Sequence, residues 1–168
     1  SAASDVYKRQ GVDGTGVADV LHHHGRTPSD HVLGLVGGGG AARSTASAWA
    51  ELGGRIHQLP SRRMFEDVPY MDAMTSDAPD VIVDFDNKDV LDAEVLLLRS
   101  VYEPMDGTVD ERAAAITGGV LDGRWLLVAQ HLACWRLLWA PERAQDLPSL
   151  GMLLTQLLEA ESLLATYA

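Results

Sequence analysis

Residues 31–63 read HVLGLVGGGGAARSTASAWAELGGRIHQLPSRR. The apolar run at residues 31–36 is typical of a strand that is buried on both faces. Four glycines follow, and the small, alanine-rich residues 41–52 then favour a helix that ends at a pair of glycines. Residues 55–59 form a second strand candidate. The stretch therefore predicts a strand, a glycine turn, a helix and a parallel second strand.

The rest of the chain continues this alternation of strands and helices. Predicted strands lie at residues 80–85, 94–98 and 120–121, predicted helices at residues 16–24, 109–116, 123–139 and 149–168, and a loop at residues 140–148. The pattern predicts an α/β protein with a Rossmann-like, doubly wound parallel sheet followed by C-terminal helices.

Composition argues against several classes of protein. The 168 residues carry a formal net charge of −11, whereas binding to nucleic acid or to anionic membranes requires clustered Lys and Arg. No apolar run approaches the roughly 20 residues that cross a bilayer, and the start has no apolar signal-peptide core. We therefore expect a cytoplasmic protein whose partners are neither nucleic acid nor membrane.

Neither the single cysteine nor the histidine cluster favours a metal site. Cys134 lies in an apolar run, where a buried helix thiol is commoner than a catalytic nucleophile, and one cysteine makes no disulfide or zinc site. His22, His23 and His24 are adjacent, and successive helical side chains point about 100° apart. A solvated helix end is thus favoured over a metal site, and we expect no metal.

The glycine turn fits a dinucleotide-binding fingerprint. Gly37, Gly39 and Ala42 match the pattern G-x-G-x-x-A, between a predicted strand and a predicted helix. In such a turn the pyrophosphate lies on backbone N–H groups at the helix N-terminus, where the helix dipole favours anions. The cofactor-binding residues expected here are Gly37, Gly38, Gly39, Gly40 and Ala41. A purely structural glycine turn is the alternative.

The end of the second predicted strand indicates which cofactor is bound. An NAD site places Asp or Glu there, whereas an NADP site uses Arg for the 2′-phosphate. No acidic residue lies between Gly54 and Arg63, and the strand is followed by Ser61, Arg62 and Arg63. These residues favour NADP, because guanidinium groups bind phosphate in a bidentate manner. The alternative is that both arginines are ordinary surface residues.

Five motifs together resemble the shikimate dehydrogenase family, in its C-terminal, nucleotide-binding half. The resemblance covers nearly everything from Gly11 onward. The motifs, each with its family counterpart, are DGTG at 13–16 (N-T-D-G-x-G), GGGGAAR at 37–43 (G-A-G-G-A-x-R), SRR at 61–63 (N-R-T), VYEP at 101–104 (V-Y-N-P) and DGRWLLVAQ at 122–130 (D-G-x-x-M-L-x-x-Q).

The resemblance implies roles for individual residues. Asp13 matches an aspartate that binds the substrate hydroxyls and works with a lysine in proton transfer. Gln130 and Tyr102 match substrate-binding residues, and Gly123 and Leu126 match positions along the nicotinamide pocket. The structural alternatives are a helix N-cap for Asp13, a polar helix residue for Gln130 and a core aromatic for Tyr102.

The sequence also departs from the family pattern. DFDN at residues 84–87 replaces N-A-T-S, and two extra carboxylates near a pyrophosphate are electrostatically unfavourable. GVD stands where N-T-D is expected, and Arg99 stands where the family usually has Asp. Residues 63–80 leave little room for the usual helix and third strand, so we expect a reduced adenine side of the site.

The N-terminus suggests that the chain is a piece of a longer protein. Residues 1–10, SAASDVYKRQ, read codon for codon as a translated sequencing adapter, and we expect them to be an artefactual tail. The resemblance implies a preceding substrate domain that supplies the catalytic lysine. The predicted parts are a junction segment at 11–24, an NADP-binding domain at 25–122 and C-terminal helices at 123–168. We expect part of the apolar helix at 123–139 to be exposed.

The function implied is that of an NADP-dependent shikimate dehydrogenase, which reduces 3-dehydroshikimate to shikimate with NADPH in aromatic amino acid biosynthesis. The expected partner is this small-molecule substrate, with a homodimer in the complete protein, and we expect the fragment alone to be inactive. Two alternatives stay open: a non-catalytic nucleotide-binding paralogue, and a quinate or shikimate dehydrogenase that uses NAD.

Overall fold

A five-stranded, all-parallel sheet is the centre of the molecule in the computed structural model, which describes residues 2–88 and 95–166. Its strand order is β2-β1-β3-β4-β5. The strands are β1 (Val32–Val36), β2 (Arg55–Leu59), β3 (Val81–Asp84), β4 (Leu96–Arg99) and β5 (Val120–Leu121). The chain runs from β1 outward to β2, and then continues on the other side of β1 with β3, so the predicted doubly wound α/β fold is confirmed.

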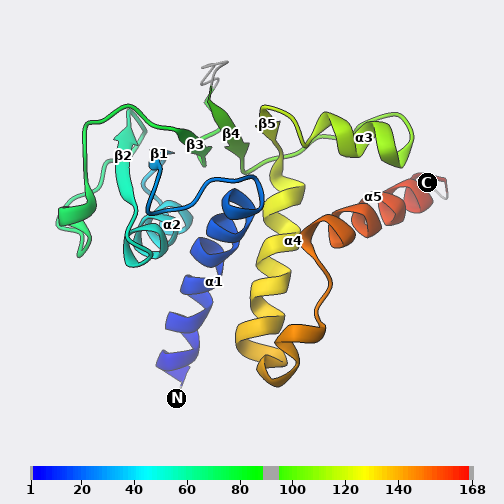
Figure 1. Ribbon diagram of the computed structural model, residues 1–168, viewed down its shortest axis with the longest axis horizontal. Helices are drawn as coiled ribbons and strands as arrows, with labels where there is room; N and C mark the ends of the chain where they lie inside the picture. The colour runs from blue at the N-terminus through cyan, green and yellow to red at the C-terminus, as the bar shows by residue number, and fades with distance from the viewer. Residues whose placement is uncertain (1, 89–94, 167–168) are drawn as a thin grey trace.

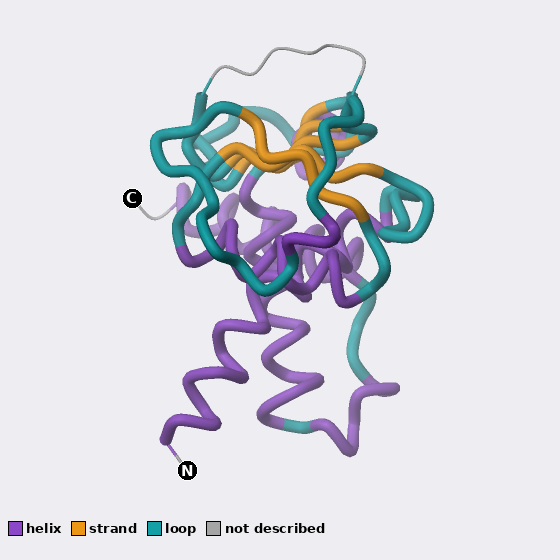
Figure 2. The backbone as a smooth tube through the Cα atoms, turned by 90° about the vertical axis from the view of Figure 1, so that its left-hand side faces the viewer, coloured by secondary structure: helices purple, strands orange, loops and turns teal. Residues whose placement is uncertain are grey.

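Three helices cover one face of this sheet: α1 (Ala2–His23), α2 (Gly40–Glu51) and α4 (Gly123–Cys134) (Figures 1 and 2). Alternate strand residues such as Leu33, Leu35 and Val83 pack against Val17, Trp49 and other helix residues in the main core. The other face carries a smaller cluster of Val36, Ile82 and Leu97. All residues of β1 and β3 are buried, which explains the apolar runs at residues 32–36 and 81–83.

The first helix is longer than the sequence predicts. It begins at Ala2 instead of Gly16, and therefore includes the DGTG motif. Two glycines make this possible, because α1 lies closely between two other helices. A Cβ on Gly14 would lie 2.2 Å from the carbonyl oxygen of Ser44 in α2, and one on Gly16 would lie 3.1 Å from the backbone nitrogen of Gln130 in α4. Helix packing thus outweighs the low helix propensity of glycine. That residues 1–10 are an artefactual tail stays a prediction.

The side of the sheet next to β2 is reduced, as the sequence predicts. A Rossmann sheet usually has a further strand beyond the second one. Here the chain instead forms a 3₁₀ turn, Met71–Ala73, and one parallel bridge between Ile56 and Met74. The N–H of Thr75 donates to the carbonyl of Ile56 at 2.8 Å. Within the described residues, this single bridge stands where a third strand would lie.

The C-terminal part of the chain is mostly helical. Helix α3 (Val109–Ala115) begins with a capping box between Thr108 and Glu111. Helix α4 ends at Cys134, earlier than predicted, and continues as a π-helical turn, Trp135–Trp139. The predicted loop contains a 3₁₀ segment, Pro141–Asp146, and helix α5 (Leu150–Thr166) follows. In the part of the chain that the structure describes, no helix is both long and apolar enough to cross a membrane.

Candidate nucleotide and substrate site

The glycine turn lies at the carboxyl end of β1, where the winding of the sheet reverses. Gly37 has φ +128°, a conformation that favours glycine, and Gly38 is buried. The N-cap of α2 is Gly39, and no side chain caps the helix. Gly39 and Gly40 are exposed, and Ala41 is half-buried in the first turn. The first N–H groups of α2 are therefore suited to an anion, as the fingerprint predicts.

The arginine loop, residues 61–63, lies beside this turn, after β2. The Ser61 hydroxyl donates to the carbonyl of Arg63 at 2.7 Å, and the side chains of Arg62 and Arg63 are exposed. Arg43, in α2, donates from Nε to the carbonyl of Gly38 at 3.2 Å. Three arginines thus lie near the glycine turn in a chain whose net charge is −11.

The two extra carboxylates, at the end of β3 and just after it, have different environments. Asp84 is fully buried; its Oδ1 accepts from the N–H of Asp86 at 2.9 Å, and its Oδ2 has no hydrogen-bond partner among the described residues. Burial raises the pKa of Asp84. Asp86 instead reaches the arginine loop, where its Oδ2 accepts from the N–H of Arg62 at 2.9 Å. Asp86 brings negative charge close to the proposed phosphate site and opposes anion binding there.

Asp13 and Gln130 come together although they are 117 residues apart. Nε2 of Gln130 donates to Oδ1 of Asp13 at 3.0 Å, between α1 and α4. Both line a cavity of about 240 Å³, together with Val12, His131, Cys134 and Trp139. Asp13 lies within α1, so the alternative of a helix N-cap is wrong. Burial raises the pKa of Asp13.

The raised pKa of Asp13 predicts a pH-dependent contribution to stability. A carboxyl group whose pKa is higher in the folded state favours folding most below the unfolded value of 3.8, and this contribution is lost as the pH rises through the folded value. We expect Asp13→Asn to remove this loss, so the variant gains stability relative to wild type as the pH increases. Urea unfolding at a series of pH values measures the difference.

Asp106→Asn, at an exposed carboxylate, is the matched control for this experiment. The predicted role of burial at Asp13 would be contradicted if the difference in free energy of unfolding between wild type and Asp13→Asn did not change with pH.

The other predicted substrate and nicotinamide residues lie in the loop after β4 and in the first two turns of α4. Tyr102 is exposed, and the guanidinium of Arg124 lies 4.5 Å from the centre of its ring. A Cβ on Gly123 would lie 2.7 Å from the carbonyl oxygen of Ser100, so glycine allows α4 to begin close to β4. Leu126 is 7% exposed and belongs to the main core. The described structure therefore groups Tyr102 with Gly123, apart from the cavity at Asp13; the roles of Tyr102, Gly123 and Leu126 stay predictions.

A buried charge cluster joins α3, α4 and α5, and no sequence motif predicts it. Arg124 is 2% exposed and bonds Asp122 at 2.5 Å, Glu161 at 3.0 Å and the carbonyl of Glu103 at 2.9 Å. Arg112 also pairs with Glu161 and donates to the hydroxyl of Ser162. In the sequence, Glu161 stands out as an acidic residue on a leucine-rich helix, but this position does not indicate which residues it pairs with.

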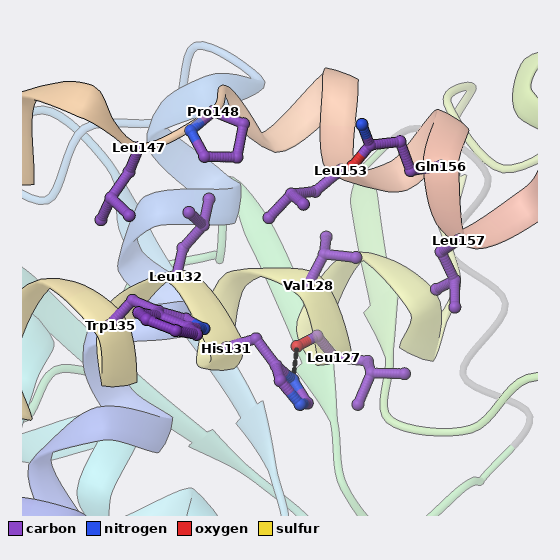
Figure 3. Close-up of a pocket in the computed structure, with 10 residues that line it drawn as sticks. All are labelled: Leu127, Val128, His131, Leu132, Trp135, Leu147, Pro148, Leu153, Gln156 and Leu157. Carbon is purple, nitrogen blue, oxygen red and sulfur yellow. Dashed lines mark hydrogen bonds between the residues drawn. The ribbon is translucent and has the colours of Figure 1, made fainter. Parts of the chain in front are cut away.

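An apolar groove of about 580 Å³ lies between α4, the segment before α5, and α5 (Figure 3). Half of its ten lining residues are leucines, and His131 at one edge donates from Nδ1 to the carbonyl of Leu127 at 2.9 Å. Trp135, Leu137 and Trp139 nearby are 47%, 48% and 59% exposed. This confirms the predicted exposed apolar patch on the helix that begins at Gly123.

The histidine cluster packs against an aromatic ring. The rings of His23 and His24 lie 5.2 and 4.6 Å from Trp125. Over residues 2–88 and 95–166, no three His, Cys, Asp or Glu side chains are grouped so as to hold a metal ion.

Comparison with known proteins supports the fold. No protein-family model and no curated protein matches the chain. The shikimate 5-dehydrogenase from Thermus thermophilus, in complex with shikimate, matches with a TM-score of 0.55 at 21% identity, over 88% of this chain and 62% of that chain. The shikimate 5-dehydrogenase from Listeria monocytogenes, in complex with shikimate and NAD, matches with a TM-score of 0.55 at 16% identity, over 88% and 62%.

A third structure, a shikimate dehydrogenase in complex with NADP+, matches with a TM-score of 0.55 at 17% identity, over 89% of this chain and 61% of that chain. The chain spans only 61% or 62% of the length of each of these three solved chains. Over most of its length, this chain has the fold found in part of these shikimate dehydrogenase structures.

Proposed function

We propose that the chain is the nucleotide-binding part of an NADP-dependent shikimate dehydrogenase, an oxidoreductase that acts on 3-dehydroshikimate and shikimate. The observation that carries the proposal is the hydrogen bond between Asp13 and Gln130 beside a cavity. The two residues come from two motifs that resemble the family independently of each other. If either resemblance were accidental, there would be no reason to expect the two residues to meet at one cavity.

The proposed chemistry divides between this chain and a substrate domain. Bound NADPH supplies the hydride that reduces the carbonyl of 3-dehydroshikimate. Asp13 and Gln130 bind substrate hydroxyls, and Asp13 takes part in proton transfer with a lysine that this chain does not contain. Burial already favours the protonated form of Asp13, which suits a group that exchanges a proton with its substrate. By itself the chain binds cofactor but does not turn over substrate.

The residues around the glycine turn fit a dinucleotide with a 2′-phosphate. The uncapped N-terminus of α2 suits the pyrophosphate. Arg62 and Arg63 are exposed, and the backbone of Arg63 lies against Gly38 of the turn, which supports assigning these arginines to the 2′-phosphate. Asp86 is the unfavourable group, because its carboxylate lies in the same loop region.

A non-catalytic nucleotide-binding paralogue is the second candidate, and the position of Asp86 favours it. A quinate or shikimate dehydrogenase that uses NAD is the third, and the Listeria neighbour was solved with NAD. Turnover of 3-dehydroshikimate by the complete parent protein separates an enzyme from a paralogue. A preference for NAD over NADP+ would favour the third candidate.

Replacing both arginines of the loop tests the cofactor assignment. We expect Arg62→Gln/Arg63→Gln to weaken NADP+ binding roughly 10- to 100-fold, because charge-assisted hydrogen bonds to phosphate contribute about 1.5–3 kcal/mol. NAD binding should change little, since NAD has no 2′-phosphate. Isothermal titration calorimetry with the 168-residue chain measures both affinities.

The matched control is Arg143→Gln, which removes an exposed arginine from the segment Pro141–Asp146. Equal losses of NADP+ and NAD affinity in the double variant would contradict the assignment of these arginines to the 2′-phosphate.

A further inference from the structure

Gln58, in β2, bonds through its side-chain amide to both the glycine turn and the arginine loop. Its Nε2 donates to the carbonyl of Gly37 at 3.0 Å and to the carbonyl of Arg63 at 3.2 Å. Its Oε1 accepts from the N–H of Phe65 at 2.7 Å. Both amide hydrogens and one side of the oxygen are therefore used in joining backbone atoms of two segments.

The two segments approach each other closely at this point. A Cβ on Gly38 would lie 2.1 Å from the carbonyl oxygen of Arg63, so only glycine allows the present distance. Arg43 adds a second connection, because it donates to Gly38 and its guanidinium lies 5.5 Å from the centre of the Phe65 ring. The backbone from which Arg62 and Arg63 project is thus fixed relative to the N-terminus of α2.

This fixed distance has a consequence for ligand choice. A dinucleotide with a 2′-phosphate carries a pyrophosphate for the helix N-terminus and, one ribose away, a separate phosphate for the arginines. Both are bound well only if the turn and the loop keep their spacing. A dinucleotide without the 2′-phosphate needs the turn alone.

We infer that Gln58 determines the preference for a 2′-phosphorylated dinucleotide by holding the arginine loop against the glycine turn. Gln58 acts as a positioning residue, because its side-chain amide forms hydrogen bonds with backbone groups and the contacts to phosphate come from other residues. The inference rests on the proposed cofactor function and adds the residue that enforces its selectivity.

The test replaces Gln58 with methionine, which has a similar length but makes none of the three hydrogen bonds. We expect Gln58→Met in the 168-residue chain to lower NADP+ affinity at least about tenfold and NAD affinity by no more than about threefold. The readout is the ratio of NADP+ affinity to NAD affinity, measured by titration calorimetry. A general loss of structure would lower both affinities and leave this ratio unchanged. Gln145→Met, in the exposed segment before α5, is the matched control and should leave the ratio unchanged.

A second variant covers the case in which Gln58→Met does not fold. Gly38→Ala leaves Gln58 intact but forces the glycine turn and the arginine loop apart. This variant should also lower the ratio of NADP+ affinity to NAD affinity. An unchanged ratio in whichever of these variants folds would overturn the inference. If the wild-type chain binds neither dinucleotide, the proposed function fails instead, so the two failures are distinguishable.

Discussion

The Gly14→Ala variant should unfold at a much lower urea concentration than the wild-type chain, with a loss of about 3 kcal/mol in the free energy of unfolding. The added Cβ would lie 2.2 Å from the carbonyl oxygen and 2.7 Å from the carbonyl carbon of Ser44. Both are backbone atoms, so relief requires α1 and α2 to separate. Separation would also break the hydrogen bond from the N–H of Gly14 to the Ser44 hydroxyl.

Gly11→Ala provides a control in the same helix. Apart from its chain neighbours and the nearby backbone of α1 itself, no described atom lies within 4 Å of the position of its Cβ. The same substitution should therefore stabilise the chain by about 0.5–1 kcal/mol through helix propensity. Equal stability of the Gly14→Ala and Gly11→Ala variants would show that α1 does not pack against α2 as described.

Arg124→Met should lower the free energy of unfolding by about 3–5 kcal/mol, because it removes one partner from a buried cluster of charges. Arg124 is 2% exposed, and its loss leaves Asp122 without this ion pair and the carbonyl of Glu103 without its donor. The ring of Tyr102 also loses the guanidinium that lies over it. Urea denaturation monitored by circular dichroism measures the change.

Arg143→Met is the corresponding surface control. Arg143 and Asp146 form an ion pair whose side chains are 70% and 55% exposed, and such pairs contribute at most about 1 kcal/mol. A loss below about 1 kcal/mol for Arg124→Met would mean that the cluster does not hold α4 and α5 together.

The sheet could be predicted from the sequence because its strands are buried on both faces. The sequence shows apolar runs at residues 32–36 and 81–83 for that reason. Helix α1 could not be placed correctly, since its helical state depends on the packing of Gly14 and Gly16 against residues far along the chain. Local propensity favours a loop there, and only the tertiary contacts reverse it.

For the candidate site, the resemblance suggests which residues to consider but not how they are connected. Asp13 and Gln130 were expected at the substrate site by resemblance, while the bond between them depends on how α1 crosses α4. The role of Gln58 could not be predicted from the sequence. Its partners are backbone atoms of a turn and a loop, and backbone atoms leave no pattern in the sequence. Arg124 was missed for a related reason: its main partner lies 37 residues away on another helix.

The exposed π-helical turn that follows α4 means that the chain has two kinds of tryptophan. Trp49 and Trp125 are 0% and 2% exposed in the core, whereas Trp135 and Trp139 are 47% and 59% exposed. Indole emission shifts to longer wavelength in water, so the fluorescence of this chain combines a core pair with a solvated pair. Any molecule that covers the turn Trp135–Trp139 would change only the second component, and the chain therefore carries an intrinsic optical reporter for that surface.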